Sequence, residues 1–446
     1  MRKPSVLVVF LTVFIDLIGF GLVLPLLPIY SERFGAGGFM IGAIMASFSA
    51  MQFLFAPAWG RLSDRIGRRP VLLVSTAGAA VSYAIFAIGS GLQDHTALWV
   101  ILGSRILAGI CGANITVAQA YIADVTPPED RSKKMGLIGM AFGLGFICGP
   151  LIGWVSPNSW GLPGPGWIAA TLCAANFFLA LAVLPESWKP SSEHASQRPR
   201  LEQWAHTLNH PKIALIIGIF FLATFCFTCF ETTLGLLVSR NFGLDLVNNK
   251  GTIYFLFAYA GIVGAVVQGG AIGRLVKKMG EPKLISVSLL LVALSLGPLP
   301  FVHGTEPLSF SILFHPGGLP WLGLFLFLGI LAIGSGLTRP PVFGLISVLT
   351  PAHEQGATIG VAQSAGSLAR ILGPVFASTL FTRHPTLPYL ICSGVALLAG
   401  ILAWQSLCKT DPAVTAVAQN HSSNPVGGAY SGQPRVNPDK PQGRIV

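Results

Sequence analysis

Long apolar stretches follow one another along this chain, and polar residues occur mainly in the short segments between them. Several stretches contain no Asp, Glu, Lys or Arg, including residues 71–93, 135–185, 284–305 and 307–338. About 20 residues of helix cross a hydrocarbon core of ~30 Å, so each stretch is long enough for one or two membrane-spanning helices. The same unbroken runs exclude the alternating pattern of membrane barrel strands.

The pattern predicts an all-α membrane protein with twelve transmembrane helices. We place the spans at residues 5–29, 38–59, 71–91, 97–120, 135–155, 167–185, 212–234, 251–272, 283–303, 320–345, 355–380 and 387–407. The first span follows Arg2 and Lys3 as a signal peptide would. Its length, its internal Asp16 and the spans that follow it predict a helix that is not cleaved.

Composition and charge support a membrane protein and indicate its orientation. The chain is 52% hydrophobic and only 10% charged, whereas soluble domains carry about 25% charged residues. The formal net charge of +11 does not indicate nucleic-acid binding, because the basic residues lie between the apolar segments. With the N-terminus inside, 21 of the 28 Lys and Arg residues are cytoplasmic, 4 are outside and 3 lie within helices. This asymmetry predicts that both termini are cytoplasmic.

The chain divides into two similar six-helix halves, residues 1–185 and 212–407. The segment GRLSDRIG from Gly60 follows the second span, and GRLVKKMG from Gly273 follows the eighth. Such a parallel repeat predicts a pseudo-twofold axis along the membrane normal, with a site at the interface of the halves. Residues 186–211, rich in Pro, Ser and charge, are the expected cytoplasmic linker. Residues 408–446 lack apolar periodicity and predict a disordered cytoplasmic tail.

The loop after the second span reads GRLSDRIGRRP from Gly60 to Pro70. Here the sequence resembles the major facilitator superfamily, and within it the twelve-helix drug/proton antiporters that include tetracycline efflux proteins. The resemblance covers nearly all of residues 5–407. It implies that the charged loop latches the cytoplasmic face when the carrier opens outward. The gating residues so implied are Gly60, Arg61, Asp64, Arg65, Gly67, Arg68 and Arg69.

Two further spans carry the resemblance. The fourth holds Arg105 within the membrane, and the fifth reads GFICGPLIG, similar to the antiporter signature of the family. Its signature residues are Gly145, Gly149, Pro150 and Gly153; small residues allow close helix packing, and the proline bends the helix. The third span departs from tetracycline exporters, since Ser82 stands where they carry an acid. This departure disfavours a metal-chelated tetracycline as substrate.

Four charged residues inside the spans are the candidate central groups: Asp16 and Arg105 in the first half, and Glu231 and Arg370 in the second. Asp16 and Arg105 both fall near mid-depth, and Glu231 and Arg370 both fall in the outer half of the membrane, so each half offers an acid and an arginine that can pair. A charge in the membrane usually faces the bundle interior with a partner. Because hydration and pairing change during alternating access, Asp16 and Glu231 are candidate proton sites. The candidate polar lining residues are Gln52, Asn114, Gln119 and Gln363.

The sequence thus predicts a secondary transporter that exports small amphipathic compounds in exchange for protons, working as a monomer. With Arg339 near the inner end of the tenth span, three arginines stand against two acids within the membrane, and this excess leaves open an exchanger of organic anions or metabolites. A membrane enzyme or sensor is the remote alternative, since no metal-ligand cluster, nucleophile constellation or phosphate loop occurs among the spans. No cofactor, metal or nucleic acid is expected. The seven scattered Cys predict packing and no disulfide framework.

Overall fold

The computed structural model describes residues 6–408, except residues 113, 127–130, 156–159, 188–199, 246–249, 310, 313–314 and 351–354. The predicted tail from residue 409 onward lies outside these residues. Within the described ranges every regular element is a helix, as expected for an all-α membrane protein. Eight helical stretches are long and apolar enough to cross a membrane, and shorter apolar helices lie at His95–Cys111, Met140–Trp154 and Gly251–Val266.

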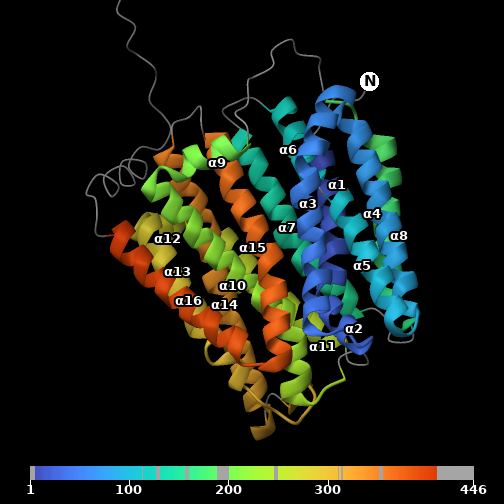
Figure 1. The fold of residues 1–446 in the computed structure, drawn as a ribbon, viewed down its shortest axis with the longest axis vertical. Helices are drawn as coiled ribbons and strands as arrows, with labels where there is room; N and C mark the ends of the chain where they lie inside the picture. The colour runs from blue at the N-terminus through green and yellow to red at the C-terminus, as the bar shows by residue number, and fades with distance from the viewer. Residues whose placement is uncertain are drawn as a thin grey trace, which may run out of the picture. The chain divides into compact units, whose positions relative to one another are not determined.

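The helices fall into two groups that follow the chain (Figure 1). The first group comprises α1 (Val6–Val23), α2 (Leu27–Arg33), α3 (Gly38–Ile66), α4 (Arg68–Gly91), α5 (Asp94–Cys111), α6 (Asn114–Val125), α7 (Arg131–Val155) and α8 (Gly164–Val183). A short helix, α9 (Arg200–Leu208), lies within the predicted linker. The second group comprises α10 (Pro211–Phe242), α11 (Lys250–Val266), α12 (Ile272–Met279), α13 (Glu281–Leu296), α14 (Leu319–Leu349), α15 (Gln355–Arg383) and α16 (Leu387–Ala403).

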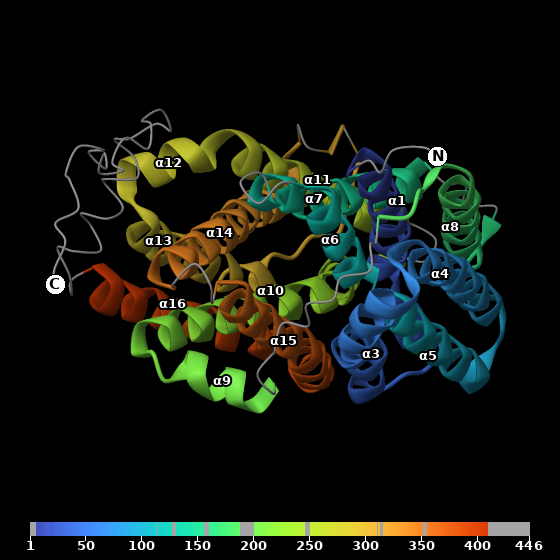
Figure 2. The ribbon, with the colours of Figure 1, turned by 90° about the horizontal axis from the view of Figure 1, so that it is seen from above.

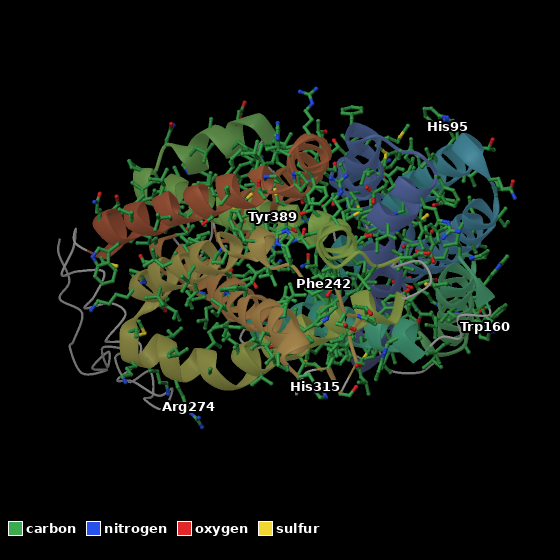
Figure 3. All side chains as sticks on the ribbon, turned by 90° about the horizontal axis from the view of Figure 1, so that it is seen from below. His95, Trp160, Phe242, Arg274, His315 and Tyr389 are labelled. Carbon is green, nitrogen blue, oxygen red and sulfur yellow. The ribbon has the colours of Figure 1, made fainter. Side chains whose placement is uncertain are left out.

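Two pairs of helices join the groups: α3 packs on α15, and α7 packs on α11 (Figure 2). Seen from below, Phe242 and Tyr389 lie among the helices of the second group, whereas His95 and Trp160 lie at the margin of the first (Figure 3). Tyr389 is buried, and its hydroxyl accepts a hydrogen bond of 3.0 Å from Thr233 Oγ1, which ties α16 to α10.

The predicted fourth span is not one continuous helix, because it breaks at Gly112 between α5 and α6. A broken helix leaves backbone carbonyls without partners, which is costly in a membrane. Side chains of α3 supply donors at the break. Trp59 Nε1 donates to the Ile110 carbonyl at 2.6 Å, and Gln52 Nε2 donates to the Gly112 carbonyl at 2.9 Å. The carbonyl groups of Ile110 and Gly112 at the break are therefore hydrogen-bonded by side chains of α3.

The two ends of the bundle differ, and we name them by residues. The α2 end holds α2 and the first turn of α3, and the Arg68 end holds the junction of α3 and α4 (Figure 1). Because α1 runs from the Arg68 end to the α2 end, the position of any residue along a helix places it nearer one end or the other. This frame locates the predicted site residues.

Candidate functional site

Asp16 lies half-buried on α1, with a neutral side chain as its partner. The amide Nδ2 of Asn176, on α8, donates to Asp16 Oδ1 at 2.9 Å and to the Thr12 carbonyl at 2.8 Å. Asn176 is itself buried. The first predicted acid is therefore connected to α8 through an amide.

Arg105 is fully buried on α5, and aromatic rings surround it. Its guanidinium carbon lies 4.8 Å from the ring centre of Phe48 and 5.8 Å from that of Phe20. Tyr83, on α4, lies close to the guanidinium, and among the described residues Arg105 Nε has no hydrogen-bond partner. Cation–π contacts and one polar neighbour thus replace the carboxylate that a buried arginine would normally have.

The pairing of Asp16 with Arg105, suggested by their similar depth, takes an indirect form in this structure. Both side chains belong to the described part of the chain, and no ion pair joins them. Tyr83 is 4% exposed and lies close to both charged groups. Sequence reasoning missed Tyr83 and Asn176, since each looks like an ordinary polar residue of an apolar span; only helix rotation brings them to the acid.

In the second half, Glu231 and Arg370 lie near each other without contact. Arg370, on α15, is attracted by Glu231 of α10 and repelled by Arg339 of α14. All three side chains are described, and no ion pair of 4.0 Å or less joins Glu231 to either arginine. Arg370 instead donates to Ser367 Oγ at 2.9 Å. The interaction of Glu231 with Arg370 in some conformation stays a prediction.

The gating loop forms a network at the Arg68 end. Arg68 Nε and Asp124 Oδ2 form an ion pair of 3.1 Å that links the start of α4 to the end of α6. A second guanidinium nitrogen of Arg68 donates to Ser63 Oγ at 2.6 Å, and Ser187 Oγ donates to Asp124 Oδ2 at 3.0 Å. Arg68 therefore connects α3, α4 and α6, with the segment after α8 attached through Asp124.

Only some of the other predicted gating residues have side chains that the structure describes. The side chains of Arg61 and Asp64 lie outside the described set, so their latch role stays a prediction. Arg65 is exposed, and Gly60 is half-buried. Gly67 separates α3 from α4 with φ of 99°, a conformation that favours glycine.

Glu186 belongs to the network at the Arg68 end, and the predicted gating set did not include it. Its carboxylate accepts the backbone N–H of Arg68 at 2.9 Å through Oε1 and that of Arg69 at 3.0 Å through Oε2. These are the first two residues of α4, and Gly67 before them offers no side chain to cap the helix. A carboxylate at a helix N-terminus satisfies free N–H groups and interacts well with the helix dipole. Its signal in the sequence was the segment LPES, from Leu184.

We expect Glu186→Ala to lower the free energy of unfolding by about 1–2 kcal/mol, the usual effect of losing a helix cap. The measurement is the melting temperature of the purified protein in detergent. Glu202→Ala is the matched control, because Glu202 is an exposed acid on α9. Equal melting temperatures for the two variants would contradict the capping role.

The glycines of the predicted antiporter signature on α7 pack against two different helices. A Cβ atom added to Gly145 would lie 2.8 Å from Leu17 Cβ, and one added to Gly149 would lie 2.6 Å from the carbonyl carbon of Gly21, both on α1. At Gly153 the added atom would overlap the ring of Tyr254, on α11. Pro150 lies inside the helix between these contacts. The signature thus brings α7 into backbone contact with α1 and fits it to the second half.

The predicted lining residues have different surroundings. Gln52 serves the break at Gly112, as described above, and Gln363 accepts a hydrogen bond from Arg339 at 3.3 Å. Gln119 is half-buried on α6, and the side chain of Asn114 lies outside the described set. Their role toward a substrate stays a prediction.

Contacts between the halves concentrate at the α2 end. The hydroxyl of Tyr254, on α11, donates to the Leu22 carbonyl of α1 at 3.0 Å. Arg240 of α10 forms an ion pair of 3.6 Å with Glu32 of α2 and stacks over Phe381 at 5.1 Å. Gly38 and Gly42, at the start of α3, approach α15 so closely that an added Cβ would overlap Ser378 or Val375. The α2 end is therefore closed.

A sequence model of the Major Facilitator Superfamily matches residues 9–374 of the chain. The chain belongs to this superfamily. The resemblance found in the loop and helix motifs is thereby confirmed. Major facilitator proteins are membrane transporters of small molecules and not enzymes, so this chain is a major facilitator transporter embedded in a membrane through several helices.

Similar major facilitator proteins include drug exporters. The tetracycline resistance protein of class B from Escherichia coli is 30% identical over 83% of this chain and 86% of its own length. Multidrug resistance protein 2 of Bacillus subtilis is 26% identical over 90% of this chain and 94% of its own length. The crystal structure of the human organic anion transporter MFSD10 matches with a TM-score of 0.62 and 25% identity, over 90% of this chain and all of that one.

Proposed function

We propose that this major facilitator protein exports small amphipathic compounds in exchange for protons, by alternating access between two six-helix halves. The proposal assigns twelve spans, with residues 1–185 and 212–407 as the halves and both termini in the cytoplasm. Residues 186–211 then link the halves, and a single chain is the working unit. The drug exporters among the similar proteins support export. The excess of Lys and Arg at the Arg68 end supports its assignment to the cytoplasm.

The observation that carries proton coupling is the setting of Asp16. It is a half-buried carboxylate within a membrane helix, and its hydrogen-bond donor is the neutral amide of Asn176. Because Oδ1 of a protonated carboxyl can still accept a hydrogen bond, the contact with Asn176 does not prevent Asp16 from taking up a proton. As the halves move, the hydration of the site changes, so the proton can be loaded on one side of the membrane and released on the other.

Transport by purified protein in proteoliposomes tests the proposal. We expect uptake of compounds from an amphipathic panel only when a pH gradient of the correct direction is imposed, and no net accumulation without it. Accumulation that is equal with and without the gradient would remove proton coupling. No transport of any compound under either condition would remove the proposed substrate class.

With the Arg68 end in the cytoplasm, the closed α2 end is the extracellular gate. Alternating access then requires Glu32 and Arg240 to separate during each cycle. We expect a reversible thiol crosslinker to stop transport by Glu32→Cys/Arg240→Cys protein and a reductant to restore it. Both positions are partly exposed, at 39% and 41%, so the substitutions leave the core intact. The two single-cysteine variants are controls for labelling of the native thiols. Undiminished transport by fully crosslinked protein would contradict the closed gate.

A further inference from the structure

Two arginines from different helices of the second half lie close enough to repel one another, and neither forms an ion pair within the described residues. Arg339 of α14 donates to Gln363 Oε1 at 3.3 Å, and Arg370 of α15 donates to Ser367 Oγ at 2.9 Å. Both partners are neutral. Glu231 is the acid near Arg370, and it makes no ion pair with either arginine within the described residues. If Glu231 is ionised, the three groups still sum to one positive charge.

Both guanidinium groups belong to the membrane interior. Arg339 lies ten residues before the end of α14, about 15 Å from the Arg68 end, and Arg370 lies about 22 Å from the same end along α15. Charges at such depth are expensive unless they face water or a partner. Arg339 is nevertheless exposed, and Arg370 and Gln363 are half-buried. The two guanidinium groups therefore keep exposed surface and are not packed shut among the helices.

The site faces the interior of the helix bundle and not the lipid. Gly336, one turn before Arg339 on α14, is directed at α11, since an added Cβ would lie 3.6 Å from the Gly264 carbonyl oxygen. Residues three apart share a helix face. Arg339 therefore extends from an inward face of α14 and reaches α15 through Gln363. A surface arginine that merely extends to the membrane interface would have no reason to span two helices.

An aromatic wall adjoins the two guanidinium groups. The guanidinium carbon of Arg339 lies 5.7 Å from the ring centre of Phe343, which packs edge-on against Phe220 of α10 at 5.1 Å. At Gly366 an added Cβ would lie 2.8 Å from Phe220 Cε1 and 3.6 Å from a guanidinium nitrogen of Arg370. The absence of a side chain at Gly366 thus lets the phenyl ring and Arg370 lie together. Positive charge and apolar surface meet at one place.

We propose that Arg339 and Arg370 form the anion-binding end of the substrate site, and that the substrate class is monoanionic aromatic carboxylates. This inference rests on the transport function proposed above and specifies its substrate. A guanidinium group presents a fork of N–H donors that matches a carboxylate, and such charge-assisted hydrogen bonds are about twice as strong as neutral ones. The single net positive charge matches a monoanion, and the half-buried ring of Phe343, backed by the buried ring of Phe220, contacts the aromatic part.

Equilibrium binding of 2-naphthoate to the purified protein tests this inference without requiring transport. The matched probe is 2-naphthamide, which has the same ring system and no charge. We expect wild-type protein to bind the carboxylate more tightly than the amide. Arg339→Gln and Arg370→Gln should each weaken carboxylate binding by about tenfold or more, the effect of one lost charge-assisted hydrogen bond, and leave amide binding unchanged.

Two further variants control for folding and for bulk charge. Arg370→Lys keeps the charge without the fork and should bind the carboxylate between wild type and Arg370→Gln. Arg274→Gln removes an exposed arginine of α12 and should bind as wild type does. Melting temperatures of the unliganded variants show whether each is folded. If Arg370→Gln is unfolded, weaker binding of 2-naphthoate by Arg370→Lys than by wild type shows that the guanidinium group of Arg370 binds the carboxylate.

Three results would overturn the inference. The first is that wild-type protein does not bind 2-naphthoate at all, and the second is that it binds 2-naphthamide with equal affinity. The third is that Arg339→Gln and Arg370→Gln bind 2-naphthoate no more weakly than Arg274→Gln does. Failure of the inference is separable from a failure of proton coupling. A protein that transports neutral compounds on a pH gradient but does not prefer 2-naphthoate keeps the proposed function and loses the arginine site. A protein that binds 2-naphthoate through both arginines but transports without regard to the pH gradient keeps the arginine site and loses proton coupling.

Discussion

Asp16→Asn is expected to abolish accumulation of substrate against its gradient while binding and downhill exchange survive. A pH gradient of one unit supplies ~1.4 kcal/mol, enough for about tenfold accumulation when one proton is exchanged per substrate. Asparagine keeps an Oδ1 acceptor for the Asn176 amide, so the contact between α1 and α8 is retained and only the titrating proton is lost. The variant should therefore equilibrate substrate to equal concentrations. Proteoliposome uptake with a one-unit gradient measures this.

Glu231→Gln, which removes the acid of the second half, is the natural comparison for that experiment. If Glu231→Gln accumulates substrate as wild type does and Asp16→Asn does not, proton coupling is assigned to the first half. Reconstituted Asp16→Asn protein that still concentrates its substrate would end the coupling role of Asp16 and direct attention to Glu231.

The second large effect is expected at Gly149, where α7 meets α1. A Cβ at this position would lie 2.6 Å from the carbonyl carbon of Gly21 and from the nitrogen of Leu22. These are backbone atoms, which cannot turn aside as a side chain can, so Gly149→Ala must separate the helices. Overpacking of this kind costs about 1–3 kcal/mol and often more. We expect a melting temperature lower by several degrees and a reduced yield of folded protein.

Gly143→Ala provides the opposite result on the same helix. No atom lies within 4 Å of a Cβ added there, and the position is exposed. Alanine is the better helix former, so this substitution should leave the melting temperature unchanged or raise it slightly. A drop equal to that of Gly149→Ala would show that loss of flexibility, and not contact with α1, explains both.

The sequence predicted the helices and the family more fully than it predicted the site. Apolar length and a few motifs are enough for the former, because a membrane span is defined by composition along the chain. The rotation of each helix about its own axis, which decides which side chains face one another, depends on contacts with other helices. Depth placed Asp16 beside Arg105, but it could not show that Tyr83 and Asn176 stand around them. Glu186 opens the predicted linker, yet its partners are over a hundred residues away, in α4.

The same reasoning explains why the break at Gly112 was missed. The stretch containing it is apolar on both sides, so its periodicity predicts one helix. The interruption is permitted by donors on α3, including Trp59 and Gln52, which the local sequence does not contain. Long-range contacts decide such features, and a single sequence carries no direct record of them.

The rings around Arg105 bear on which compounds the first half can admit. Phe20 and Phe48 lie 4.9 Å apart and present their electron-rich faces to the guanidinium. An aromatic pair of this kind is the usual receptor for quaternary ammonium and other lipophilic cations. Here the guanidinium group of Arg105 already occupies the site between the rings. A dissolved cation would have to displace Arg105 or approach a surface of its own charge, so we expect the first half to discriminate against cationic drugs.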